Sequence, residues 1–399
     1  MKSWRERLTL PAAIASEAAG SPASAVWTFP LMIFAAFVVS WGAEAAEFLI
    51  SQGLALAILA LIQTLPEFAV EAVIAWKAGK DPNMVHLAIA NFTGSLRLLT
   101  GLGWPMIYAV AAFYSRRKHG RKLGSIDLHD DHAVEVMGLL PPLAWFIVVW
   151  AKSSLSLVDA FVLTTTYVVY LVVLLKLPPR DETVEEDEEI PRVSKWALSQ
   201  TGWKRWAAVL GLLVAGGAII FFVAEPFLVS MMALAATMGI SQFVFIQWVA
   251  PFLSEFPEKT SAFAWARRVT RAPVALMNMV SSNINQWGVL SAMLAVIYCL
   301  SKGEVTALPF DEFQRLEILL TIVQAFLGWI FLASMSLSAY EAAGLFVLWV
   351  IQFVRPSLRK EMLWVYGAWI VFELVRIVIG KQKIRAFGAL ARVWKKRKR

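Results

Sequence analysis

Two stretches of the chain place a glutamate directly after a proline, inside segments that are otherwise apolar enough to be buried in a membrane. Glu67 follows Pro66 in the first stretch, and Glu258 follows Pro257 in the second. A carboxylate in hydrocarbon is costly unless it is paired or binds a cation, and a proline removes a backbone donor, so helix carbonyls are left facing inward. Both stretches therefore contain the residue types of an oxygen-lined cation site.

A second polar motif follows each Pro-Glu stretch, one predicted helix later. Residues 91–95 read NFTGS, and residues 278–282 read NMVSS. Hard cations prefer oxygen ligands, and calcium takes about six to eight of them, so hydroxyls at these motifs are candidate ligands beside the glutamates. Because the same construction occurs twice, the sequence implies an internal repeat. Repeated, broken helices that meet at mid-membrane form the ion sites of many secondary transporters.

These motifs resemble the two alpha repeats of the cation/calcium exchanger superfamily. The family pattern reads roughly G-T-S-x-P-E, then N-x-x-G-S-N-x-x-N or N-x-x-G-S-N-x-x-D. The lead-in segments at residues 43–50 and 224–229 match as well, so the resemblance covers roughly residues 27–356. It implies a sodium/calcium exchanger-like membrane protein that carries its ion on Glu67 and Glu258. The other ligands that we expect around this ion are Thr64, Ser95, Ser254, Ser282, Glu255 and Gln286.

The chain departs from the family pattern at several of these positions. Where the first repeat of the family has asparagine or aspartate four residues after the serine, this chain has Leu99, and the second repeat has Gln286. Leu96 replaces the asparagine next to the first serine, and Glu255 replaces a small hydroxyl residue. One side-chain ligand is therefore lost and one acid is gained.

Arg97 adds a fixed positive charge two residues beyond Ser95. A guanidinium stays protonated in proteins, so inside a membrane it needs a carboxylate partner. We expect Arg97 to pair with Glu255 or Glu67 across the pseudo-two-fold axis of the repeats. In the alternative interpretation its long side chain reaches a membrane surface and never meets the site.

Composition places the chain among polytopic membrane proteins. Of its 399 residues, 59% are hydrophobic and 17% are charged, whereas globular domains carry about 25% charged residues. The single cysteine, Cys299, forms no intrachain disulfide. Neither an H-E-x-x-H protease signature nor a phosphate-binding G-x-x-x-x-G-K sequence is present, so an enzyme is disfavoured. Nucleic-acid binding is also disfavoured, because we expect no soluble domain to carry the formal charge of +8.

The apolar segments predict an all-α protein of ten core transmembrane helices in two repeats, plus one extra C-terminal transmembrane helix. Since each repeat has five helices, the second must enter from the opposite side, so the repeats are inverted. The predicted parts are an N-terminal surface segment (1–25), the first repeat (26–177), an acidic, solvated cytoplasmic linker (178–204), the second repeat (205–356), the eleventh helix (357–380) and a basic cytoplasmic tail (381–399).

Local patterns add three expectations about the helices. The third segment is predicted to bend near Gly94 or at Gly101 and Gly103. The start of the tenth predicted helix, at residues 337–342, echoes the start of the fifth, at residues 155–160, which supports a repeat of five plus five helices. The third expectation concerns the eleventh helix, where an acid and a base three residues apart, Glu373 and Arg376, have the spacing of a same-face ion pair.

Basic residues predict the orientation in the membrane. The positive-inside rule places the loop at residues 115–131, the linker and the C-terminal tail in the cytoplasm. The membrane that we expect to contain the protein is the cell's inner (plasma) membrane. Nine basic residues lie in the last 19 positions, among apolar residues at helical spacing. This pattern is typical of a basic amphipathic helix on an anionic lipid leaflet, and equally of a solvated tail that only anchors the topology.

The sequence as a whole predicts a secondary active cation antiporter without a cofactor. It would exchange calcium, or a related cation, for sodium or protons by alternating access through a glutamate site at mid-membrane. Glutamates serve protons and metal ions alike, so the residues leave the driving ion open. The alternatives are sodium/proton exchange, or a degenerate membrane scaffold of the same fold in which Arg97 and Leu99 abolish transport.

Overall fold

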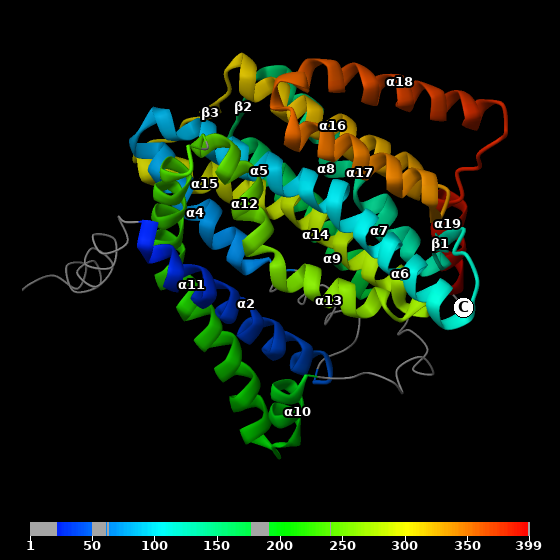
Figure 1. Ribbon diagram of the computed structural model, residues 1–399, viewed down its shortest axis with the longest axis horizontal. Helices are drawn as coiled ribbons and strands as arrows, with labels where there is room; N and C mark the ends of the chain where they lie inside the picture. Colours follow the sequence, from blue (N-terminus) through cyan, green and yellow to red (C-terminus); the bar gives the residue numbers. More distant parts are fainter. Residues whose placement is uncertain (1–21, 50–60, 62–63, 177–190, 240, 398–399) are drawn as a thin grey trace, which may run out of the picture. The chain divides into compact units, whose positions relative to one another are not determined.

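The computed structural model describes residues 22–49, 61, 64–176, 191–239 and 241–397, and most of them are helical (Figure 1). The predicted all-α membrane fold is confirmed at this level. Within the described ranges, seven helical stretches are long and apolar enough to cross a membrane: Pro22–Gly42, Pro82–Lys118, Asp130–Lys152, Leu157–Leu175, Trp203–Thr237, Val269–Lys302 and Glu312–Leu332. The ten-plus-one helix count stays a prediction.

The chain forms two compact units, and each unit combines a piece of both predicted repeats. The first unit comprises residues 1–91 and 179–258, and the second comprises residues 92–178 and 259–399. The described helices of the first unit are α2 (Ala25–Glu47), α4 (Leu65–Lys80), the first half of α5 (Val85–Leu98), α10 (Arg192–Ser199), α11 (Trp203–Thr237), α12 (Gln242–Ser254) and the start of α13 (Phe256–Ala266).

In the first unit, α2 and α11 pack side by side along much of their length (Figure 1). A hydrogen bond of 2.8 Å between the hydroxyls of Thr28 and Ser230 joins them. The sequence predicted a solvated linker up to residue 204, but residues 192–199 form α10, which packs against α2. The reason is local: α10 buries Ser194 and Ala197, and the Ser194 hydroxyl donates to the Trp41 carbonyl at 3.0 Å. The acidic part of the predicted linker, at residues 181–189, lies outside the described residues.

Both Pro-Glu stretches stand at the start of a helix, directly after a break. The first helix, α4, begins after Thr64 and carries Pro66 in its first turn, where the missing N–H of proline costs no helical hydrogen bond. In the second stretch, α12 ends at Ser254 and α13 begins after Glu255. The helix breaks predicted beside the two glutamates are therefore present.

The second unit contains the other described helices. They are the second half of α5, α6 (Trp104–His119), α7 (Ala133–Gly138), α8 (Leu140–Lys152), α9 (Leu157–Leu175), the rest of α13, α14 (Ala272–Asn285), α15 (Ser291–Lys302), α16 (Glu312–Leu332), α17 (Ala339–Val354), α18 (Arg359–Val378) and α19 (Ala386–Arg397).

A single π-helical turn interrupts each of the two long helices that carry the asparagine motifs. The turn η3 (Leu99–Gly103) joins α5 to α6, and η7 (Gln286–Leu290) joins α14 to α15. Each π turn begins four residues after the motif serine, Ser95 or Ser282. Of the two predicted positions for a bend, the structure has its irregularity at Gly101 and Gly103. Such π turns are rare and frequently mark functional sites.

Four short strands in the second unit pair across the predicted repeats. The strand β1 (Ser125–Asp127) pairs antiparallel with β4 (Ser336–Ser338), and β2 (Ser154–Leu155) pairs antiparallel with β3 (Leu308–Pro309). The strand β1 follows α6 in the first repeat and pairs with the strand before α17 in the second. In the same way, β3 follows α15 in the second repeat and pairs with the strand before α9 in the first.

Equivalent caps begin these two helices. Asp159 of α9 accepts from the backbone N–H of Ser156 at 2.7 Å, and Glu341 of α17 accepts from that of Ser338 at 2.7 Å. The echo between the two sequences therefore corresponds to the same N-terminal cap.

The last two helices extend beyond the repeats. In α18, Arg376 and Glu373 form the predicted ion pair at 2.9 Å. The tail helix α19 packs on α7 and on the short turn at Asp130–His132, and Arg392 binds both carboxylate oxygens of Asp130 at 2.7 Å. The face of α19 that carries small residues is buried against the protein, while Phe387 on another face is 52% exposed. The tail is thus a docked helix, with an apolar side left open.

Candidate functional site

Glu67 lies at the centre of a buried polar cluster in the first unit. Its carboxylate accepts a hydrogen bond of 2.5 Å from the Ser254 hydroxyl at one oxygen and a bond of 3.2 Å from the Asn91 amide at the other. Glu67 stands in the first turn of α4, Asn91 lies on α5, and Ser254 is the last residue of α12. The cluster therefore joins residues from the motifs of both halves of the chain, all fully or almost fully buried.

Glu71 extends this cluster by one turn of α4. The amide nitrogen of Asn91, which donates to Glu67, also donates to Glu71 at 2.6 Å, so it bridges the two carboxylates. Glu71 is fully buried. It was not among the expected ligands, although its spacing of four residues from Glu67 places both acids on one face of a helix and could have identified it.

The other predicted ligands of the first unit are also buried. Thr64, Glu255 and Glu258 are at most 1% exposed, and the Thr64 hydroxyl donates to the Leu61 carbonyl at 2.9 Å. The first unit therefore buries four carboxylates, those of Glu67, Glu71, Glu255 and Glu258, and its described residues include no buried lysine, arginine or histidine. The nearest buried base along the chain is Lys259, the first residue of the second unit's C-terminal segment.

Ser95, Ser282 and Gln286, the remaining predicted ligands, belong to the second unit. Each is buried, on α5, on α14 and at the first position of η7 respectively. The side-chain amide of Asn283 donates to the Leu96 carbonyl at 3.4 Å and so ties α14 to α5 between these positions. The two motif helices are therefore in direct polar contact.

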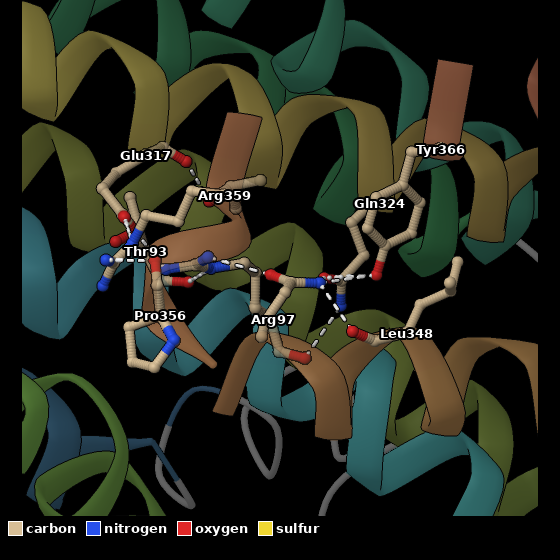
Figure 2. A network of polar contacts seen from close by, with 10 residues as sticks. Thr93, Arg97, Glu317, Gln324, Leu348, Pro356, Arg359 and Tyr366 are labelled. Atoms are coloured by element: carbon tan, nitrogen blue, oxygen red, sulfur yellow. Dashed lines mark hydrogen bonds and ion pairs between the residues drawn. The ribbon is translucent and has the colours of Figure 1, made fainter. Parts of the chain in front are cut away.

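Arg97 is the centre of a second buried network, which lies entirely in the second unit (Figure 2). Its guanidinium forms an ion pair with Glu317 of α16, donates to the Gln352 side chain of α17 at 3.0 Å and donates to the Thr93 carbonyl at 3.2 Å. The other carboxylate oxygen of Glu317 pairs with Arg359 of α18. One buried acid thus serves two arginines.

Neutral groups continue the network on the other side of Arg97, as Figure 2 shows. The Tyr366 hydroxyl of α18 accepts from Gln352 at 2.8 Å and donates to Gln324 of α16 at 3.1 Å. Gln324 in turn donates to the backbone carbonyl of Arg97 at 3.0 Å. Arg97 therefore joins α5 to its neighbouring helices through both its side chain and its backbone carbonyl.

The sequence analysis predicted Glu255 or Glu67 as the partner of Arg97. Within its own unit the ion pair of Arg97 is made by Glu317, a residue that the sequence analysis did not single out, because it lies on a distant helix outside the repeated motifs. Arg97 is only 1% exposed, so its side chain is buried and does not extend to a membrane surface.

The apolar helical fold, with its helix breaks and its buried acids and amides, defines an integral, multi-pass membrane protein of the ion-transporter class. The family model described as "Sodium/calcium exchanger protein" matches residues 21–176 and 208–356, that is, most of the chain. The chain belongs to this family, whose members are cation antiporters. The predicted resemblance to the cation/calcium exchanger superfamily is thereby confirmed.

Solved structures of exchangers are similar to this chain. The crystal structure of the H+/Ca2+ exchanger CAX matches with a TM-score of 0.81 and 29% sequence identity, over 94% of this chain and 91% of that chain. Two structures of the sodium-calcium exchanger NCX_Mj match with TM-scores of 0.55 and 0.56 and with 17% and 18% identity; both comparisons cover 84% of this chain and 97% and 99% of the other. No curated protein sequence matches the chain.

Proposed function

We propose that this protein is a secondary active antiporter that exchanges calcium for protons, with Glu67 and Glu258 as its principal ion-binding residues. The observation that carries the proposal is the buried cluster in which Glu67 is bound by Asn91 and by Ser254, from the two halves of the chain. Carboxylates, hydroxyls and amide oxygens are the ligands that calcium prefers. The similarity over almost the full length to a protein titled an H+/Ca2+ exchanger favours protons over sodium as the driving ion.

The coupling follows from competition for the same groups. The first unit buries four carboxylates, and ionised carboxylates away from water are costly without compensating positive charge. A divalent cation and protons both bind carboxylates, and occupancy by one excludes the other. Alternating access then exposes the site to one side of the membrane at a time, as the remaining helices rock or slide about the central segments.

Inverted repeats, which such a mechanism uses, are supported by three pairs of equivalent features. The π turns η3 and η7 follow the two motif serines at the same distance. The strands pair crosswise between the halves. Helices α9 and α17 begin with the same cap. We therefore propose that residues 26–177 and 205–356 are the two repeats and that residues 357–380 form an additional helix.

Uptake of radioactive Ca²⁺ into proteoliposomes tests this function. We expect uptake when a proton gradient is imposed, and loss of uptake in Glu67→Gln and in Glu258→Gln. The matched control is Glu304→Gln, which removes an acid that is paired with Lys302 at the surface. Uptake driven only by a sodium gradient would overturn the assignment of protons. If neither a proton gradient nor a sodium gradient drives any uptake, the degenerate scaffold is favoured.

We also propose that the tail lies at the cytoplasmic face of the cell's inner (plasma) membrane, with α19 against anionic lipid. The buried small residues of α19 pack on α7, while Phe387 remains half exposed beside lysine and arginine residues. An amphipathic helix of this kind binds anionic leaflets through both its apolar and its basic groups. Protection of α19 from proteolysis by vesicles that contain anionic lipid, but not by neutral vesicles, is the expected result.

A further inference from the structure

Two buried oxygen atoms beside Glu67 have no hydrogen-bond donor among the described residues. They are Oε1 of Glu71 and Oδ1 of Asn91. The Asn91 nitrogen already donates to both Glu67 and Glu71, at 3.2 and 2.6 Å, so its donors are used and its carbonyl oxygen is left over. Buried polar atoms in proteins are almost always satisfied, and an orphaned buried oxygen therefore calls for an explanation.

Covalent geometry keeps both orphaned oxygens close to the hydrogen bond that joins Asn91 to Glu71. The oxygen and nitrogen of one amide, and the two oxygens of one carboxylate, are each only about 2 Å apart. Because the Asn91 nitrogen also donates to Glu67, both unused oxygens belong to groups of the cluster that contains the Glu67 carboxylate. Both unused atoms are hydrogen-bond acceptors, and the Asn91 amide has no further N–H to donate. The group that binds these two oxygens must therefore be positively charged or must donate hydrogen bonds.

We propose that Glu71 and Asn91 are direct ligands of the transported cation, and that the pair Glu67 and Glu71 makes the site selective for a divalent over a monovalent ion. This inference rests on the proposed function and names its specificity-determining residues. Acids four residues apart on one helix face repel each other. With Glu258 the ligands carry three negative charges, of which a divalent ion compensates two and a monovalent ion only one.

The alternative is that Glu71 is a structural acid that only anchors Asn91. A structural anchor and a ligand differ in what they do to calcium saturation. An anchor affects the stability of the ion-free protein, whereas a ligand sets the concentration at which calcium binds. The charge and the number of ligands tune calcium affinity over several orders of magnitude.

Glu71→Gln in the full-length protein separates these two roles. We expect the Ca²⁺ concentration for half-maximal uptake to rise by at least about tenfold, with a smaller change for Na⁺, and the Tm increase that Ca²⁺ produces in detergent to be lost. The ion-free Tm should not fall, because an amide relieves the repulsion between the acids. The matched control is Glu225→Gln in the same unit, where the acid pairs with Lys77 near the surface.

Unchanged calcium saturation in Glu71→Gln, with or without a lower ion-free Tm, overturns the proposal. If this variant does not fold, Glu71→Asp keeps the charge on a shorter side chain, and saturation equal to that of the wild type overturns the proposal in the same way. If the wild type shows no uptake under any gradient, the proposed function fails. The Ca²⁺-dependent Tm still decides separately whether Glu71 is a ligand.

Discussion

Glu317 is predicted to be the most sensitive residue of the Arg97 network, because its carboxylate binds both Arg97 and Arg359. Removing one partner of a buried ion pair costs about 3–5 kcal/mol, since the charge left behind has no compensation. Glu317→Gln removes the acid that pairs with Arg97, which is 1% exposed, and with Arg359, which is 13% exposed. The loss is a large share of the roughly 5–15 kcal/mol that stabilises a typical domain.

The two arginines are expected to be less sensitive than Glu317. Arg97→Leu leaves Glu317 paired with Arg359, although it removes the bonds to Gln352 and to the Thr93 carbonyl. Arg359→Gln leaves Glu317 paired with Arg97, and Arg359 at 13% exposure is the less buried of the two arginines, so this should be the mildest change. The predicted order of destabilisation is therefore Glu317→Gln, then Arg97→Leu, then Arg359→Gln.

Unfolding in detergent, followed by intrinsic fluorescence, measures this order. The double variant Arg97→Met with Glu317→Leu should be more stable than Glu317→Gln alone, because it removes the buried charges together. In proteoliposomes, Arg97→Leu should keep the number of protons exchanged per calcium ion. A changed stoichiometry with unchanged stability would refute the reasoning, because it would place Arg97 in the ion site and make its bonds to α16 and α17 incidental.

Two further predictions concern the equivalent parts of the repeats. Gly101→Ala should lower the Tm strongly, since an added Cβ would lie 2.4 Å from the Cβ of Trp349, whereas Gly288→Ala, with its nearest atom at 3.1 Å in Tyr167, should lower it less; equal effects would contradict this packing. Ser156→Ala and Ser338→Ala should each cost about 0.5–2 kcal/mol of unfolding free energy, because each serine side chain accepts from the backbone N–H three residues later, and a loss at only one of them would argue against equivalent caps.

Local sequence predicted those parts of the site that depend on neighbours in the chain. The Pro-Glu pairs predicted helix breaks beside the two glutamates, because proline removes a backbone donor, and the structure has these breaks where α4 and α13 begin. The spacing of Glu373 and Arg376 predicted their ion pair, since residues three apart share a helix face.

Contacts between distant segments could not be predicted in this way. Glu317 lies on a helix with no counterpart to the repeated motifs, so nothing near it in the sequence indicates Arg97 as its partner. The π turn at Leu99–Gly103 depends on close packing of Gly101 against Trp349 of α17, which only the folded chain brings together. The small residues through which α10 and α19 pack on the protein were likewise not recognised, because charged residues dominate the sequence around them.

An experimental structure with calcium bound tests the central claim most directly. We expect a bound ion with carboxylate oxygens of Glu67 and Glu258 at about 2.3–2.6 Å, the usual distance between calcium and its oxygen ligands. An ion bound elsewhere in a protein that transports calcium, with neither glutamate in contact with it, would contradict the account.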